Sequence, residues 1–297
     1  GCLSRGLQGQ SQDSSSGHVG RACYRPAAMR HVGVGWIPLS FGVMLSGSCL
    51  LTFVWAMLRG DVTPYVPFVS EAGADPPQSG FFSLCLFISV TLGLMSVLVR
   101  FQTVQALNAA YSKRLDALNG ASALTAVVSC LGMASVAAFP LGTVPTAHAV
   151  SANVLFFGMF AYQVMQTVIT FWMFPSFNGR RIFFVRLTIT TLSGLAVLIM
   201  AILSPIGKQQ WYSQNYTHPL KQKQPSDEGF PLLVASATFE WLLGLCLVLF
   251  FFTFVREFHK VTLEVKADVL VEHMDDEPIF RKSPFMSETT YLRAHET

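Results

Sequence analysis

Residues 231–255, PLLVASATFEWLLGLCLVLFFFTFV, decide the fold class, because they form one apolar run with a single charged residue, Glu240. A helix needs roughly 20 apolar residues to cross the hydrocarbon core of a membrane. The run shows no apolar/polar alternation, so a helix is expected rather than a strand of a barrel. This stretch therefore predicts a membrane-spanning helix.

Five further runs of this kind precede it, and the composition of the whole chain agrees with them. Of the 297 residues, 52% are hydrophobic and 12% are charged, whereas soluble domains carry about 25% charged residues. The five runs are residues 36–58, 81–99, 117–139, 148–174 and 182–204. We therefore predict an all-α polytopic membrane protein: a head (1–35), a six-transmembrane-helix bundle (36–255) and a tail (256–297).

The head, residues 1–35, is rich in Ser, Gly and Gln and has no hydrophobic periodicity, so we expect it to be disordered. No cleavable signal peptide is expected, because the first apolar run is long enough to span a membrane. The sequence is compatible with a start at Met29, which would make residues 1–28 an extension.

The positive charges are distributed unequally between the two sides of the predicted bundle. If the head is cytoplasmic, only four of the 20 Lys and Arg fall on the opposite side: Arg59, Lys208, Lys221 and Lys223. Cytoplasmic segments are normally enriched in Lys and Arg, so both termini are expected in the cytoplasm. The sequon Asn215-Tyr216-Thr217 then lies in a lumenal loop, and we expect Asn215 to be glycosylated.

The polar segment 65–80, YVPFVSEAGADPPQSG, separates the first two spans. Its first six residues, YVPFVS, are rich in β-branched and aromatic side chains and are expected to be extended. Asp75 suits the N-cap of the second helix, Pro76 its first turn and Gln78 the capping-box partner. Gly73 would permit a positive φ. The pattern predicts a turn that caps the second helix.

A functional interpretation of the same segment stays open. Glu71 and Asp75 are the acidic side chains of this loop, and they offer contacts to a lipid headgroup, an ion or a partner protein.

Glu240 is the carboxylate deepest inside a predicted span. It lies nine residues after Pro231, or about 13 Å along a helix. An ionisable group at this depth either locks the helix to a neighbour or serves a function. His148 and Asn153 lie at comparable depth on the fourth span and are the expected partners. Such a pair would respond to lumenal pH, because His titrates between pH 5 and 8.

The fourth span also carries a polar patch of Gln163, Gln166, Thr167 and Thr170. Hydrogen bonds between helices are the preferred interpretation. A solute pathway is the alternative, although no matching charged set is expected in the other spans. We recognise no nucleophile, metal or phosphate motif. The chain is therefore expected to be non-enzymatic, without cofactor or metal, and not to bind nucleic acid.

Several stretches, in order, resemble one known family, the damage-regulated autophagy modulators (DRAM). They are PFVSEAGADPPQ (67–78), VRFQTVQAL (99–107), VSCLGMASVAAF (128–139), AHAVSANVLFFGM (147–159) and SATFEWLLGLCLVLFFFTFVREFHKVTLEV (236–265). The most specific marks are Ser70-Glu71, Pro76-Pro77 and Glu240-Trp241. The head and the residues after Lys266 lie outside the resemblance.

The resemblance implies a protein that promotes autophagy from the lysosomal or late endosomal membrane without catalysis. Its implied partners are membrane lipids and membrane or cytoplasmic proteins. The wider superfamily includes plasma-membrane proteins tied to phosphatidylinositol 4-kinase and Golgi proteins that remodel lipid anchors. A plasma-membrane or Golgi scaffold that controls phosphoinositide or another lipid is therefore the alternative, and a channel or transporter subunit is a third. The tail shows no good lysosomal sorting signal, since Tyr291 is followed at the third position only by Ala294.

Overall fold

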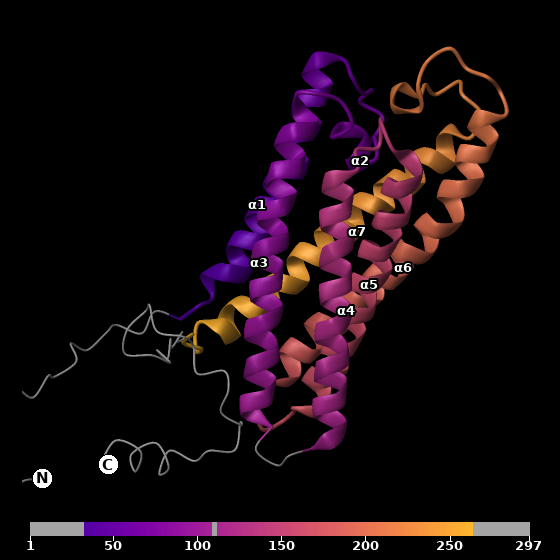
Figure 1. Ribbon diagram of the computed structural model, residues 1–297. Coiled ribbons are helices and arrows are strands. Elements are labelled where there is room, and N and C mark those ends of the chain that lie inside the picture. Colours follow the sequence, from indigo (N-terminus) through magenta and orange to yellow (C-terminus); the bar gives the residue numbers. More distant parts are fainter. Residues whose placement is uncertain (1–32, 109–111, 264–297) are drawn as a thin grey trace, which may run out of the picture. The chain divides into compact units, whose positions relative to one another are not determined.

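The computed structural model describes residues 33–108 and 112–263, and the predicted head and tail lie largely outside this part. The elements within it are all helical: α1 Trp36–Arg59, α2 Val69–Ala72, α3 Gln78–Leu107, α4 Lys113–Ala138, α5 Pro145–Trp172, α6 Arg180–Tyr212, the 3₁₀ turn η1 Leu220–Gln222, and α7 Phe230–Phe258 (Figure 1).

Six of these helices are long and apolar enough to cross a membrane, which confirms the predicted fold class. Two of them run well past their predicted ends. Helix α3 continues beyond Val99 to Leu107, and α6 continues through Pro205 to Tyr212. The apolar composition marks only the part of a helix that lies in lipid, so polar final turns escape a hydropathy criterion.

The long helices pack in the order in which they occur in the chain, each on the next, and α7 packs back on α1. The centre is filled by large apolar side chains, among them Phe41, Phe251 and Phe254. Helices α4 and α5 pack closely against each other. A Cβ at Gly132 would lie 2.8 Å from the Leu155 backbone nitrogen, so only glycine permits this approach.

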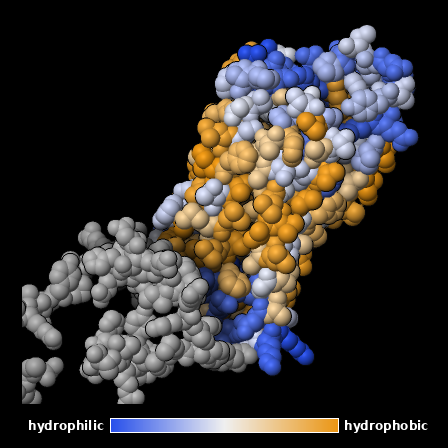
Figure 2. All heavy atoms as spheres, viewed as in Figure 1, coloured by the Kyte–Doolittle hydropathy of each residue, from blue (hydrophilic) through white to orange (hydrophobic). Residues whose placement is uncertain are grey.

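The outer surface of the bundle carries exposed leucines such as Leu58, Leu124 and Leu131. Figure 2 shows an apolar band between two polar ends on the face in view. This pattern is what a bundle surrounded by lipid requires.

One end of the bundle, here called the α2 end, carries α2 and the connecting segments 60–77, 139–144 and 213–229. The first and last of these segments are joined: the Thr63 N–H donates to the Lys221 carbonyl (3.3 Å) and its hydroxyl to the Lys223 carbonyl (3.2 Å). At the other end, the Val34 N–H donates to the Val261 carbonyl (3.1 Å), so α1 begins beside the end of α7.

The predicted capping pattern of the second span is wrong. Helix α3 begins at Gln78 with Pro77 at its N-cap and no side-chain cap bond. Asp75 instead pairs with Lys221, and the Gln78 amide donates to Asp61 (2.6 Å). Tertiary partners from distant segments have displaced the local cap.

Two other expectations for this segment also need correction. Gly73 has φ −94°, so it does not use a positive φ. It is required for space, because a Cβ there would lie 2.5 Å from the Phe82 ring. The extended stretch ends before Ser70, because Val69–Ala72 form α2.

Candidate functional site at the α2 end

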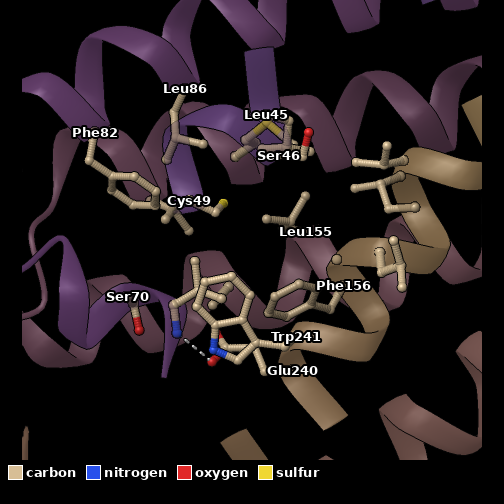
Figure 3. A pocket seen from close by; sticks show the side chains of 18 of the residues that line it. Leu45, Ser46, Cys49, Ser70, Phe82, Leu86, Leu155, Phe156, Glu240 and Trp241 are labelled. Atoms are coloured by element: carbon tan, nitrogen blue, oxygen red, sulfur yellow. Dashed lines mark hydrogen bonds between the residues drawn. The ribbon is translucent and has the colours of Figure 1, made fainter. Parts of the chain in front are cut away.

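Two consecutive residues of α7 hold α2 in place. Glu240 accepts a hydrogen bond from the Val69 N–H (3.0 Å), and the Trp241 indole donates to the Pro67 carbonyl (2.9 Å). Figure 3 shows the first of these bonds as a dashed line. We call this pair of contacts the α2 seat. It joins segments that lie more than 170 residues apart in the chain.

The predicted partners of Glu240 are therefore wrong. His148 lines the same cavity as Glu240, but its Nδ1 bonds with the Phe139 carbonyl (2.7 Å). Asn153 is exposed and donates to the Ala149 carbonyl within its own helix (2.9 Å). The sequence offers no signal for the real partner, because it is a backbone N–H of a four-residue helix.

A buried ion pair fastens α2 to the segment before α7. The Lys223 ammonium lies 3.0 Å from the Glu71 carboxylate, and the two side chains are 0% and 3% exposed. Glu71 also accepts from the Phe68 N–H (2.9 Å), and the Lys223 ammonium lies over the Phe68 ring. Burial raises the pKa of Glu71, while Lys223 and the Phe68 N–H oppose that shift. We call this pair the clamp.

A cavity of about 400 Å³ lies beneath α2, inside the bundle. Side chains from α1, α3, α4, α5 and α7 line it, and most of them are apolar. Figure 3 shows Glu240 and Trp241 of α7 across the cavity from Leu45 and Cys49 of α1. Ser70 of α2 also lines it. The size falls within the range of small-molecule sites in proteins, and we call it the α2 cavity.

The remaining predicted site residues are placed as follows. Asp75 faces Lys221, and Pro76 and Pro77 lead directly into α3. Asn215 is exposed at the α2 end and adopts a left-handed φ of 51°, which asparagine tolerates. Within the described ranges, no three His, Cys, Asp or Glu side chains are grouped so as to hold a metal ion.

The interior beyond the α2 cavity contains three charged side chains, one each from α3, α6 and α7. Arg100 of α3 and Arg186 of α6 are 2% and 0% exposed, and both bind Glu257 of α7, at 2.8 and 2.7 Å. The side-chain amide oxygen of Gln166 accepts a hydrogen bond from Arg100 (2.9 Å), and the Thr170 hydroxyl accepts one from Arg186 (2.7 Å). We call this group the arginine cluster.

The cluster settles two expectations about the polar patch of the fourth span. Its hydrogen bonds between helices are confirmed, because the Gln166 amide also donates to Ser122 of α4 (2.9 Å) and Thr167 bonds with Thr190 of α6 (3.0 Å). The expectation of no matching charged set is wrong. The sequence did contain one signal: Arg186 lies inside the predicted run 182–204, and in the structure it follows the start of α6 by six residues.

A family model described as the Frag1/DRAM/Sfk1/Cwh43P N-terminal domain matches residues 33–261. The chain belongs to this family. Human DNA damage-regulated autophagy modulator protein 2 is 30% identical over 241 residues, 80% of this chain and 88% of its own length. Modulator protein 1 of Xenopus laevis is 27% identical, over 80% and 95% of the two chains. Zebrafish (Danio rerio) modulator of macroautophagy TMEM150B is 26% identical, over 77% and 90%. No solved structure matches.

The geometry explains two of the marks on which the DRAM resemblance rests. Glu240-Trp241 forms one half of the α2 seat, and Ser70-Glu71 lies in the helix that is seated. Motifs that are far apart in the chain thus meet in one site. In this member of the family, the α2 end is where such a site is assembled.

Proposed function

We propose that the protein promotes autophagy as a multi-span protein of the lysosomal or late endosomal membrane, and that it acts by binding rather than by catalysis. The observation that carries this proposal is the extent of the family match. The family match covers the six-helix bundle, with both halves of the α2 seat. The relatives that align with the chain are named as autophagy modulators.

The state of the site supports binding. Most polar groups of the seat and clamp are engaged, for example Glu71 with Lys223 and Trp241 with Pro67. The α2 cavity remains open beside them. Its largely apolar lining with a few polar groups is typical of a binding site.

The charge distribution supports an orientation with both termini in the cytoplasm and the α2 end in the lumen. Arg59, Lys208, Lys221 and Lys223 are the only Lys and Arg on the α2 side in this topology. Arg100 and Arg186 do not count as surface charges, since both lie inside the bundle. The Lys and Arg of the flanking segments still favour the opposite end as cytoplasmic.

One observation favours the alternative of a lipid-regulating scaffold at the plasma membrane or Golgi: the bundle encloses an apolar cavity. A transporter subunit is supported less, because apolar side chains line the α2 cavity and the arginine cluster ties α3, α6 and α7 together beyond it. The α2 cavity and the arginine cluster do not together form a continuous polar path for a solute.

The test is depletion and rescue in starved cells, with turnover of the lipidated autophagosome marker measured with and without a lysosomal inhibitor. Depletion should lower the flux, and the wild-type chain should restore it. Trp241→Phe should restore it only in part, since loss of one buried donor costs about 1 kcal/mol. Trp36→Phe is the matched control, because Trp36 is exposed at the start of α1.

The location of the rescued protein is scored in the same cells. Normal flux after depletion, together with a plasma-membrane location and altered phosphatidylinositol 4-phosphate, would refute the autophagy proposal and favour the lipid scaffold.

A further inference from the structure

We propose that the α2 cavity binds one membrane lipid that has a small head with a hydrogen-bond donor, a hydroxyl or an ammonium group. The donor would meet Glu240, and the apolar body of the lipid would fill the rest of the cavity. This inference does not rest on the role in autophagy, since it concerns the cavity of the bundle itself.

The acceptor is the free half of the Glu240 carboxylate. Glu240 is 7% exposed and lines the cavity, and its Oε2 accepts from the Val69 N–H. Among the described residues, the Val69 N–H provides the one hydrogen bond found for this carboxylate, so its Oε1 is left open toward the cavity. A carboxyl oxygen that faces an apolar cavity without a partner is costly. A donor supplied by a ligand would remove that cost.

The other polar groups around the cavity are mostly occupied. The Trp241 indole donates to Pro67, the Ser46 hydroxyl donates to the Gly42 carbonyl (2.7 Å), and His148 Nδ1 bonds with Phe139. The wall away from Glu240 is formed by side chains such as Leu86 and Val248. A ligand with one polar point and an apolar body fits this lining, whereas a sugar or a hydrated ion does not.

The dimensions agree with a single chain or a compact ring system. The lining residues on α7 run from Glu240 to Val248, which is about 12 Å along a helix. The volume, about 400 Å³, lies near the lower end of the range for ligand sites. A complete two-chain phospholipid would therefore not be enclosed.

The cavity reaches the outer surface between α1 and α7. Leu50 of α1 and Leu245 of α7 both line it, yet they are 56% and 53% exposed. Gly244 of α7 also lines the cavity, and an added Cβ there would have nothing within 4 Å. In a membrane this surface faces hydrocarbon, so a lipid can enter sideways without leaving the bilayer.

The local charges argue against an anionic headgroup. Glu240 itself is an acid, and no ammonium group of the α2 end lines the cavity: Lys208 lies over the Phe68 ring and Lys223 is paired with Glu71. A phosphate in the cavity would face the Glu240 carboxyl group, with no Lys or Arg among the described residues that line the cavity. The proposed ligand is therefore not a phosphoinositide.

The experiment uses the full chain reconstituted in lipid vesicles and three photoactivatable, clickable probes: a sterol, sphingosine and phosphatidylinositol 4-phosphate. The sterol or the sphingosine probe should label peptides that contain residues 45–50, 148–156 or 240–248, and the unlabelled lipid should compete. Glu240→Gln keeps an acceptor for the Val69 N–H and distinguishes a lipid with an ammonium head from one with a hydroxyl head. It should weaken labelling about tenfold for an ammonium head and only slightly for a hydroxyl head.

Blocking the mouth provides the decisive variant. Gly244→Leu should reduce specific labelling at least about fivefold, because the new side chain extends into the opening. Gly120→Leu on α4 is the matched control, since Gly120 is exposed and its added Cβ also meets open space. Ala152→Leu fills the cavity from α5 as a second variant, and Ala149→Leu on the exposed face of that helix is its control.

Labelling that is spread over the lipid-facing helices and unchanged by Gly244→Leu and Ala152→Leu would overturn the proposal. The proposal would also be overturned if the phosphatidylinositol 4-phosphate probe labelled the cavity as strongly as the sterol and sphingosine probes.

Discussion

At the scale of single residues, Glu257 has the most demanding position, because one carboxylate serves two buried arginines. Arg100 and Arg186 come from different helices, and their guanidinium groups also lie over the Phe254 ring, at 5.4 and 4.6 Å from its centroid. Buried charges persist only when they are paired and hydrogen-bonded. The carboxylate thus determines how α3 and α6 can sit against α7.

Replacing Glu257 with Gln should lower the stability of the folded bundle by about 3 kcal/mol, because removal of one partner leaves buried charge uncompensated. In this case two guanidinium groups lose their counter-charge. The measurement is thermal unfolding of the purified protein in detergent, where the midpoint should fall by roughly 6–12 °C.

Glu228→Gln is the matched control, since Glu228 is exposed in the segment before α7 and should change the midpoint little. An equal midpoint for the Glu257 variant and wild type would show that the arginine cluster does not hold the bundle together.

The sequence revealed individual residues only where their chemistry contrasts with their surroundings. Glu240 was predictable as a buried carboxylate, because it stands alone in an apolar run. Its partner was not, since Val69 contributes only a backbone N–H. Arg100 looks like an ordinary flanking charge in the sequence and Arg186 lies inside a predicted span, but only the packing of three helices shows that both point inward.

At the scale of elements, α2 is the least self-sufficient part of the bundle. A helix of four residues has almost no stability of its own, because helix nucleation is unfavourable. Its position therefore depends on the seat and the clamp. The six long helices were predictable from apolar runs. Helix α2 carries no such signal, and hydrogen bonds and an ion pair with residues distant in the chain hold it in place.

The clamp should behave as a coupled pair in a double-mutant cycle. Glu71→Gln and Lys223→Met should each destabilise the bundle by about 3 kcal/mol, since each leaves a buried, unpaired polar or charged group. The double variant should lose much less than the sum of the two, because both charges are then removed. Thermal unfolding in detergent measures all four corners of the cycle.

Arg59→Met provides the comparison with an exposed pair. Arg59 bonds with Asp61 (2.9 Å), but its side chain is 46% exposed, so the expected cost is below about 1 kcal/mol. Additive effects in the Glu71/Lys223 cycle would contradict the clamp as an energetic unit.

At the scale of the whole molecule, one carboxylate that holds the α2 end together, Asp227, would stay charged in an acidic lumen. Burial alone would raise the pKa of Asp227, but bonds from the Gln224 N–H (2.7 Å) and His218 (2.8 Å) outweigh it and lower the pKa. A carboxylate with a lowered pKa loses its contribution to stability only as the pH falls through that lowered value. The segment 213–229 should therefore keep this support at pH 5.

The orientation of the bundle decides whether the seat, the clamp and the α2 cavity face the inside of an organelle. Asn215 lies exposed at the same end as these sites, so its glycosylation reports that orientation directly. The measurement is the gel mobility of the expressed protein before and after endoglycosidase treatment, beside Asn215→Gln. We predict that the enzyme shifts the wild-type protein to the mobility of the variant. An unshifted wild-type band, with residues 213–219 labelled by a reagent confined to the cytoplasm, would contradict a lumenal α2 end.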